Sequence, residues 1–323
     1  MLQWVGRFRR LDARIEVPVV FRVCAIVVAF NPDLDRLRVV LDKLTSQVER
    51  IVIVDNGSAN LGGLGALVAG LSNGVLLAAR RNLGVGAALN RGVEVARAAE
   101  FDAVLLMDQD SIPSVTLVSD LVNTLQYVSS VGRRVAAIGP RFVDRHSGNL
   151  SQHVVFSGWR IKRVECGASS ESVEVDFLIT SGSLIPMSTL RVVGVFDEKL
   201  FIDHVDTEWV LRARSQGFHA YGDCSATMEH DLGEFRQRIW LGRRREIPIH
   251  KPFRYYYIVR NSLLLRRLPH ASAVWRRVDA IRLVKVAVFM ALFHPQRMTV
   301  CHMMIHGLRD GLRGRTGKRN VEM

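Results

Sequence analysis

Hydrophobic residues along the chain fall either in short unbroken runs or at helical spacings. Val23–Phe30, Ile51–Val54 and Ala103–Met107 are apolar runs of the length typical of strands that are buried on both faces of a parallel sheet. Between the first two runs, Asp33–Val48 carries leucines at a helical spacing. A strand, a helix and a strand joined by short links form a βαβ unit with a right-handed crossover. The pattern predicts an α/β fold with a Rossmann-like, mixed but mostly parallel sheet flanked by helices.

Each of these predicted strands is followed by polar residues. Asn31 follows the first strand, Asp55-Asn56 the second, and Asp108-Gln109-Asp110 the third. Open α/β sheets bind ligands at the carboxyl ends of their strands, so we expect a crevice there that can hold a nucleotide. Asp55 could accept a hydrogen bond from a pyrimidine N3–H group. An aspartate after a strand is also a common N-cap or turn former, and this alternative stays open.

Asp108 and Asp110 suggest a metal site. They are one residue apart, and Pro113 then ends the strand pattern. On an extended backbone two such carboxylates point the same way and repel each other. A divalent cation that bridges them to a diphosphate would remove the repulsion, and carboxylate oxygens suit Mg²⁺ or Mn²⁺. The alternative is a solvated turn that happens to hold two aspartates.

A stretch rich in small residues, Asn82–Gly92, follows a third candidate strand at Val75–Ala78 and opens a helix. Its Gly84-x-Gly86-x-x-Leu89 segment lacks the third glycine of the dinucleotide fingerprint, so we do not expect a nicotinamide site. The small side chains would let backbone N–H groups and the Asn82 amide approach a phosphate or sugar. Close packing of the helix on the sheet explains them equally well.

The second half of the chain adds three candidate features. Val175–Ile185 is interpreted as a strand interrupted at Ser181-Gly182, where a glycine marks a bulge or a close approach of a ligand. Asp206 begins a segment that can open a helix, either as its N-cap or as a general base placed beside the acidic metal site. His230 follows another short strand, and the choice between a structural histidine and a ligand stays open.

The chain of 323 residues has a net charge of +13, and that charge is unevenly distributed. Residues 236–320 hold 20 Lys/Arg against 3 Asp/Glu, so the rest of the chain is slightly acidic. We predict an N-terminal extension at 1–21, a nucleotide-sugar-binding and catalytic domain at 22–235, and a basic helical region at 236–323.

Within that last region we expect helices at 253–268, 273–293 and 298–312. The middle one is basic and amphipathic, which favours binding to an anionic membrane surface. Packing on the core or on a subunit partner is the alternative. No recognition motif for nucleic acid accompanies the positive charge, so we do not expect a nucleic-acid partner.

The cysteine pattern and the N-terminus bear on the compartment. The four cysteines are far apart along the chain: Cys24, Cys166, Cys224 and Cys301. We interpret them as isolated thiols in a reducing compartment rather than as a disulfide framework or a zinc site. The N-terminus lacks the apolar core of a secretory signal, and no run of 18 apolar residues appears. These features predict a cytoplasmic protein, peripheral on the inner face of the cytoplasmic membrane.

Several ordered motifs together resemble a known family. They are Val27–Asn31, Val54–Ser58, Asn82–Gly84 with Asn90–Gly92, Leu106–Asp110, Phe201–Trp209 and Arg260-Asn261. This set is similar to the inverting family 2 glycosyltransferases of the GT-A fold. Within that family it resembles the bacterial L-rhamnosyltransferases of rhamnolipid and O-antigen synthesis. The resemblance covers roughly residues 22–315.

The resemblance implies a donor, a metal and a set of site residues. The donor would be a nucleoside-diphosphate sugar, dTDP-β-L-rhamnose, used with Mg²⁺ or Mn²⁺. The acceptor would be a glycolipid or a lipid-linked glycan. The implied residues are Phe30, Asn31 and Asp55 at the thymine, Asn82 at the ribose or diphosphate, Asp108 at the ribose and metal, Asp110 and His230 at the metal, Arg260 at the diphosphate or acceptor, and Asp206 as the catalytic base.

The implied mechanism is a single displacement. Asp206 would take the proton of an acceptor hydroxyl, which attacks the anomeric carbon opposite the diphosphate and inverts its configuration. Three alternatives remain at this point: a transferase of the same fold with another nucleotide sugar, a nucleotidyltransferase, and a non-catalytic scaffold that binds a membrane or nucleic acid. The sequence indicates neither the oligomeric state nor the choice between Mg²⁺ and Mn²⁺.

Overall fold

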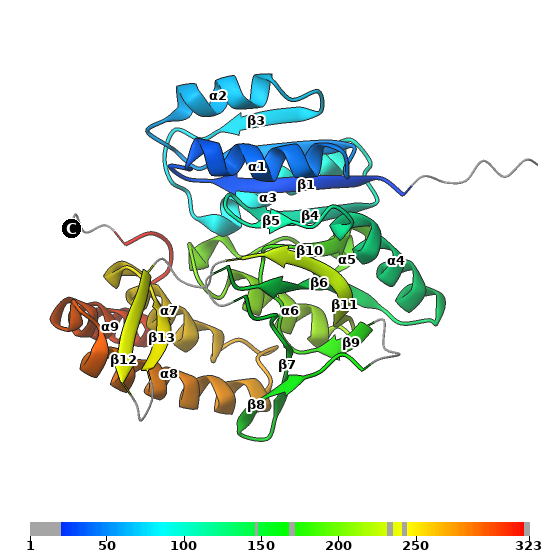
Figure 1. Ribbon diagram of the computed structural model, residues 1–323. Helices are drawn as coiled ribbons and strands as arrows, with labels where there is room; N and C mark the ends of the chain where they lie inside the picture. Colours follow the sequence, from blue (N-terminus) through cyan, green and yellow to red (C-terminus); the bar gives the residue numbers. More distant parts are fainter. Residues whose placement is uncertain (1–20, 146–147, 168–171, 231–234, 241–243, 320–323) are drawn as a thin grey trace, which may run out of the picture.

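The computed structural model describes residues 21–145, 148–167, 172–230, 235–240 and 244–319, and within them it confirms the α/β fold. One mixed sheet has the order β3-β2-β1-β4-β10-β6-β11-β5, with β9 paired to β11 (Figure 1). Its strands are β1 (Val23–Ala29), β2 (Arg50–Asp55), β3 (Gly74–Ala78), β4 (Ala103–Asp108), β5 (Ile112–Pro113), β6 (Val135–Val143), β9 (Ser172–Val175), β10 (Ser183–Pro186) and β11 (His219–Glu229).

The direction of the strands changes in the middle of the sheet. β1, β2, β3 and β4 are parallel, whereas β10 is antiparallel to both β4 and β6. β6 and β11 are again parallel to each other. The carboxyl ends of β1, β2, β4, β6 and β11 therefore lie at one edge of the sheet, which we call the catalytic edge. In Figure 1 this edge faces the side where the C-terminal helices lie.

Helices cover both faces of the sheet, and β1 shows why. Alternate residues of β1 belong to two separate hydrophobic clusters, with Cys24 and Ile26 on one face and Ala25 and Val27 on the other. The first face packs against α3 (Val85–Ala98), α5 (Met187–Val193) and α6 (Val205–Ser215). The second face packs against α1 (Leu34–Thr45), α2 (Leu61–Ala69) and α4 (Leu117–Ser130). A strand buried on both faces appears in sequence as an unbroken apolar run.

Two local predictions need correction. The segment 175–185 is not one interrupted strand, because it holds the end of β9 and most of β10, which pair with different neighbours. Gly182, at φ +80°, turns the chain into β10, and a side chain there would collide with the Pro140 ring. Pro113 does not stop a strand, because β4 already ends at Asp108 and Ile112-Pro113 form the short strand β5 against the end of β11.

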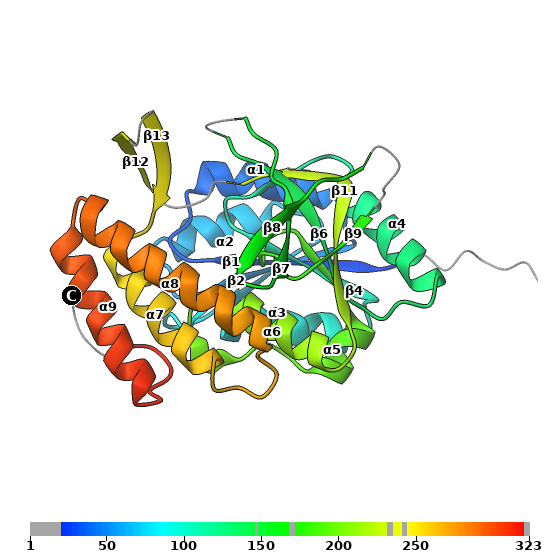
Figure 2. The same ribbon diagram turned by 90° about the horizontal axis from the view of Figure 1, so that it is seen from below.

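The C-terminal region begins with a hairpin that we did not predict, β12 (Phe235–Trp240) with β13 (Arg244–Ile249). Three helices follow as expected: α7 (Pro252–Leu265), α8 (Ala273–Phe293) and α9 (Arg297–Leu312). They lie side by side at one end of the sheet (Figure 2). Gly307 of α9 permits this close packing, because a Cβ there would overlap the carbonyl oxygen of Tyr256 on α7. The domain division near residue 235 stays a prediction.

The expectation of four isolated cysteines is wrong for two of them. Cys166, which follows the second strand of the hairpin β7 (His153–Ser157) and β8 (Arg160–Val164), forms a disulfide with Cys224 on β11. Cys24 and Cys301 are free thiols. The bonded residues are 58 positions apart, and spacing along the chain gives no sign that they meet. The predicted N-terminal extension lies almost wholly outside the described residues.

Candidate active site

Three candidate metal ligands meet at the catalytic edge. Asp108 ends β4, Asp110 follows it, and His230 follows β11; one ligand atom from each lies within 4.8 Å of the other two. The site combines carboxylate oxygens with an imidazole nitrogen, a donor set that suits Mg²⁺ or Mn²⁺. These residues therefore fit a divalent cation of the kind that the sequence predicts.

The pairing of β5 with β11 explains how His230 reaches the two aspartates. Glu229 lies opposite Ile112, so the next residue on one strand and the preceding residue on the other come together. The Ser111 hydroxyl is accordingly 2.8 Å from Nδ1 of His230, and the Phe142 ring packs edge-on against the imidazole. These contacts orient the ring, and among the contacts described Nε2 is the ring nitrogen that has no hydrogen-bond partner.

Backbone contacts hold the two aspartates in place. The Ser181 hydroxyl accepts a hydrogen bond from the Asp108 amide at 3.1 Å. Arg36 on α1 donates to the Asp110 carbonyl oxygen through Nε and Nη2, at 2.9 and 2.6 Å. Burial raises the pKa of Asp108, and the Asp110 charge adds to this, while His230 and Arg254 oppose it.

The end of β1 lies beside the metal candidates. Gln109 ties the ends of β1 and β4 together, since its Oε1 accepts from the Phe30 amide at 2.7 Å. The Phe30 ring remains 44% exposed and is available to a flat ligand such as a base. Asn31 has a positive φ of 47°, and its Oδ1 accepts from the Ala59 amide at 2.8 Å. Phe30 and Asn31 thus lie where a nucleotide was expected.

Asp55 and Asn82 shape the same side of the crevice. Asp55 is fully buried, and its carboxylate accepts from the amides of Gly57 and Ser58, at 3.1 Å each. These contacts are those of a turn-forming aspartate, the alternative that the sequence left open for Asp55. Asn82 Oδ1 accepts from the Gly84 amide at 2.9 Å and from Asn56 Nδ2 at 3.2 Å. Both side chains order loops that face the crevice.

Asp206 lies in the first turn of α6 but is not its N-cap, a position that His204 occupies. Its Oδ1 accepts from the Thr207 amide at 2.7 Å. Burial raises the pKa of Asp206 to about 6, with further contributions from the charges of Asp203 and Asp108. The influence of Asp108 places Asp206 within electrostatic reach of the metal candidates. A carboxylate with such a pKa can accept a proton near neutral pH.

The loop before α6 has an unusual backbone. Phe201, Asp203 and His204 all have positive φ, at 67°, 62° and 62°. Non-glycine residues in this region cost about 1–3 kcal/mol each and persist where their surroundings hold them. The Asp203 carboxylate accepts from Arg254 Nη2 of α7 at 2.5 Å. We call residues 200–204 the catalytic loop.

Arg260 does not have the position that we predicted for it. Its side chain is buried, and it donates to the carbonyl oxygens of Leu200 and Gly317, at 2.9 and 2.5 Å, and to Asn261 Oδ1. The Tyr257 ring covers the guanidinium, with the centroid 4.7 Å away. These contacts direct its donors into the protein and do not fit a role at the diphosphate or acceptor.

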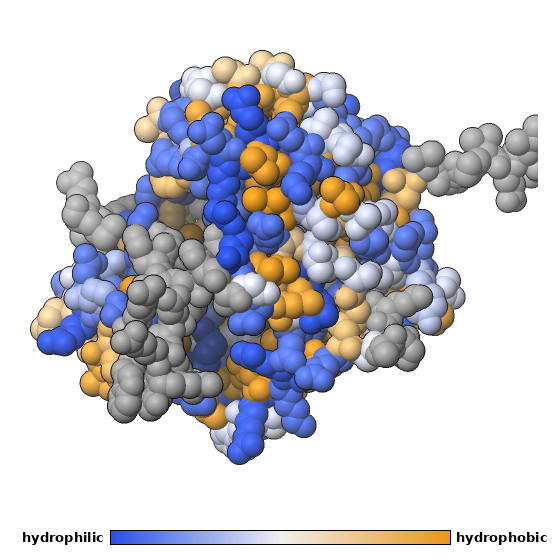
Figure 3. All heavy atoms as spheres, viewed as in Figure 1, coloured by the Kyte–Doolittle hydropathy of each residue, from blue (hydrophilic) through white to orange (hydrophobic). Residues whose placement is uncertain are grey.

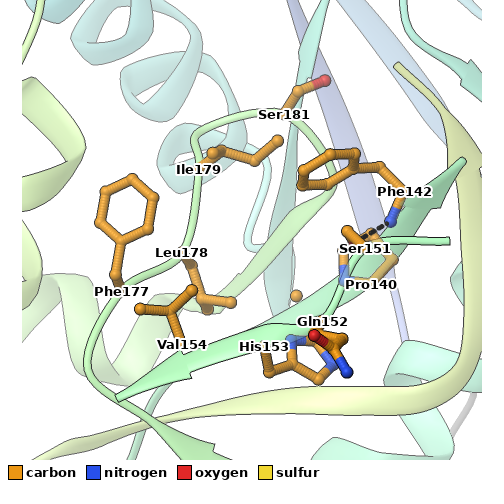
Figure 4. A pocket seen from close by; sticks show the side chains of 11 residues that line it. Pro140, Phe142, Ser151, Gln152, His153, Val154, Phe177, Leu178, Ile179 and Ser181 are labelled. Carbon is orange, nitrogen blue, oxygen red and sulfur yellow. Dashed lines mark hydrogen bonds between the residues drawn. The ribbon is translucent and has the colours of Figure 1, made fainter. Parts of the chain in front are cut away.

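A mostly apolar cavity of about 230 Å³ lies near Asp108 (Figure 4). Its wall includes Ser181, which holds the Asp108 amide, and Phe142, which packs against His230. Figure 4 shows Phe177, Leu178 and Ile179 along one side of it. The cavity therefore borders the metal candidates.

Sequence reasoning missed several residues of this site. Ser111 contacts His230, Ser181 contacts Asp108, and Arg254 contacts Asp203. Asn261 was noted only as part of a motif. For Ser111 a signal existed in its place directly after Asp108-Gln109-Asp110. No signal in the sequence indicated Arg254, because only the packing of α7 brings its side chain to Asp203 of the catalytic loop.

Comparisons with known proteins agree with this geometry. Residues 24–180 match the family model described as glycosyl transferase family 2. A curated relative, dTDP-rhamnosyl transferase RfbF of Shigella flexneri, is 29% identical over 301 residues, which are 91% of this chain and 97% of the relative.

Solved structures show the same fold at low identity. Staphylococcus aureus TarS 1-349 in complex with UDP-GlcNAc gives a TM-score of 0.57 at 12% identity, over 91% of this chain and 81% of that one. GalNAc-T7 with UDP, GalNAc and Mn²⁺ gives 0.54 at 13%, over 86% of this chain and 59% of that one. The chain therefore has the GT-A fold, and its residues 24–180 match glycosyl transferase family 2.

Proposed function

We propose that the protein transfers L-rhamnose from dTDP-β-L-rhamnose to a hydroxyl of a glycolipid or lipid-linked glycan, with inversion at the anomeric carbon. The relative named a dTDP-rhamnosyl transferase supports the donor, because the two chains match over nearly their whole lengths. The observation that carries the reaction is the grouping of Asp108, Asp110 and His230 within electrostatic reach of Asp206.

Asp108, Asp110 and His230 would hold the divalent cation. A bound Mg²⁺ or Mn²⁺ would supply positive charge against the negative charge that develops on the departing diphosphate. The chain's own residues orient the site, since Ser181 holds the Asp108 amide and Arg36 holds the Asp110 carbonyl.

Asp206 is the proposed general base. Its carboxylate accepts the proton of the acceptor hydroxyl as that oxygen attacks the anomeric carbon from the face opposite the diphosphate. One displacement inverts a β-linked donor to an α-rhamnoside. Asp203 and Glu208, the neighbouring alternatives, already pair with Arg254 and Arg212. These ion pairs favour Asp206 among the three acids.

The cavity beside Asp108 supports an acceptor with an apolar part. Two of its lining residues contact the metal candidates, since Ser181 binds the Asp108 amide and Phe142 packs against His230. Its phenylalanine, leucine and isoleucine side chains would exclude water from an acyl or prenyl segment next to the reacting hydroxyl.

The surface of α8 and α9 supports binding to an anionic membrane. Apolar side chains are exposed along one face of each helix: Val284, Val288 and Leu292 on α8, and Met298, Ile305, Leu308 and Leu312 on α9. Exposed cations accompany them, whereas the two acids of these helices, Asp279 and Asp310, are buried. Figure 3 shows hydrophobic atoms beside hydrophilic ones at the edge where Figure 1 places α9.

This combination matches a surface that lies on anionic lipid. Within the described residues, no helix has both the length and the hydrophobicity that crossing a bilayer requires.

The first prediction concerns the product. Purified protein incubated with dTDP-rhamnose, Mn²⁺ and either mono-rhamnolipid or a lipid-linked glycan should yield one acceptor with one added rhamnose, detected by mass spectrometry. UDP-GlcNAc should yield no product. Transfer from UDP-GlcNAc but not from dTDP-rhamnose would agree with a glycosyltransferase and refute the rhamnosyl donor. Formation of a nucleotide sugar from a sugar 1-phosphate would support a nucleotidyltransferase.

The second prediction concerns the base. Asp206→Asn should lower kcat about 10²–10⁴-fold, the usual contribution of general-base catalysis, in the rhamnose-transfer assay. Wild-type kcat/KM should decrease as the pH is lowered through about 6, because the pKa of Asp206 is about 6 and its protonated form cannot accept a proton. Near-normal turnover by a folded Asp206→Asn protein would exclude this residue as the base.

The third prediction concerns the orientation of His230. Ser111→Ala removes the hydroxyl 2.8 Å from Nδ1, so the imidazole loses its fixed orientation. We expect Mn²⁺ affinity, measured by titration in the presence of dTDP, to fall about 10–100-fold, the scale of outer-shell partners. The matched control is Ser119→Ala, which removes a hydroxyl that binds only the Thr116 carbonyl. Equal Mn²⁺ affinities for the two variants would contradict a metal role for His230.

The fourth prediction concerns the membrane surface. Replacing Val284, Val288 and Leu292 together by serine should weaken sedimentation with phosphatidylglycerol vesicles, because these exposed side chains would no longer enter the lipid interface. Phosphatidylcholine vesicles should bind the wild type less well. The control replaces Val115 and Val192, which are exposed on other parts of the protein, by serine. Vesicle binding that is unchanged in the triple variant would refute this surface.

A further inference from the structure

The catalytic loop needs an external support. Its three residues with positive φ lie shortly before Asp206, and the loop begins at Leu200, the last residue of the short 3-10 turn Glu198–Leu200. A loop of this conformation keeps its shape only where other groups hold its backbone. The groups that hold it come from α7, which lies more than 50 positions later in the sequence.

Asn261 is the centre of this support. It is fully buried on α7, and its Nδ2 lies 2.9 Å from the Leu200 carbonyl oxygen, 2.8 Å from that of Ile202 and 2.9 Å from that of Asp203. Its Oδ1 accepts from Arg260 Nε at 2.9 Å, which fixes the orientation of the amide. One side-chain amide thus binds three carbonyl groups of the loop.

Only one of these three carbonyl groups has a second donor among the contacts described. Arg260 Nη2 also donates to the Leu200 carbonyl oxygen, at 2.9 Å. The carbonyl oxygens of Ile202 and Asp203 have no such second donor among the contacts described. Loss of Asn261 would therefore leave the Leu200 carbonyl bonded and free those of Ile202 and Asp203. The part of the loop nearest Asp206 would then be held mainly by side-chain contacts, of Asp203 with Arg254 and of His204 with Arg282.

The loop also contacts the nucleotide side of the crevice. The Val85 amide donates to the Phe201 carbonyl oxygen at 2.6 Å. Gly84, at φ +93°, lies so close that a Cβ would be 2.6 Å from the same oxygen. The catalytic loop therefore joins the start of α3 to the start of α6, and its position determines the distance between the donor site and Asp206.

We infer that Asn261 is a positioning residue for the transfer reaction: its amide holds the carbonyl groups of Leu200, Ile202 and Asp203 and thereby places the Asp206 carboxylate at the acceptor hydroxyl. The inference rests on the proposed role of Asp206. Asn261 is not itself catalytic, because it is buried and cannot touch a substrate. A misplacement of about 1 Å in such a carboxylate can cost about 10²-fold in rate.

The test compares Asn261→Ala with Ser262→Ala. Ser262 is the next residue on α7, equally buried, and donates to Asp279 instead of the catalytic loop. We expect Asn261→Ala to lower kcat for dTDP release from dTDP-rhamnose about 10–100-fold while the KM for the donor changes less than about threefold. Ser262→Ala should lower thermal stability and keep kcat. An Asn261→Ala kcat within about threefold of wild type would overturn the inference.

Asn261→Asp keeps the shape of the side chain and replaces its donor by an oxygen that faces three carbonyl oxygens. We expect its kcat to be no higher than that of Asn261→Ala. Asn261→Ser, which keeps one donor, provides a milder variant if the others fail to fold, and its kcat should lie between those of Asn261→Ala and wild type. Wild-type kcat in folded Asn261→Asp or Asn261→Ser protein would refute the role of the amide donor.

A double-mutant cycle separates this inference from the proposed base. If Asn261 acts through Asp206, adding Asn261→Ala to Asp206→Asn should lower kcat by less than about threefold further. Additive losses would show that Asn261 acts independently, and would overturn the inference while leaving Asp206 as the base. A fully active Asp206→Asn protein would instead refute the proposed base.

Discussion

Repulsion between carboxylates at the catalytic edge is the constraint on which the rest of the site depends. Asp108 and Asp110 lie together, Asp206 is within electrostatic reach of Asp108, and burial raises the pKa of Asp108 and of Asp206. Such a group of acids needs positive charge nearby. Arg254 supplies part of it, since its charge lowers the pKa of Asp108 and it also pairs with Asp203. The first half of the chain thus builds an acidic edge that elements from the second half complete.

The parts of the fold that the sequence predicts well are those fixed by local patterning. Strands buried on both faces must be apolar throughout, so β1, β2 and β4 appear as unbroken runs. Parallel neighbours end at the same edge, which brings Asn31, Asp55 and Asp108 together without further information. The candidate metal pair could be predicted from these rules because it depends on the carboxyl end of one strand.

The parts that could not be predicted depend on contacts between distant segments. The antiparallel direction of β10 splits a stretch that looks continuous in sequence, and the pairing of β5 with β11 brings Ser111 to His230. Cys166 and Cys224 meet only because of the chain's path around the sheet. Arg260 is the most instructive case. Its motif marks it as important, but a motif does not say whether a guanidinium faces a ligand or three acceptors inside the protein.

The position of α7 connects the two proposed roles of the basic C-terminal region. One side of α7 holds the catalytic loop through Asn261, Arg260 and Arg254, and other parts of it pack on α8 and α9, which carry the exposed apolar and basic surface. A protein interior transmits small displacements because it is closely packed. The helices proposed to lie on lipid are therefore in the same packed group as the residue proposed to place Asp206. Attachment of α8 and α9 to a membrane would act on the proposed transfer step through α7, and less on donor binding, which we assign to the ends of β1, β2 and β4.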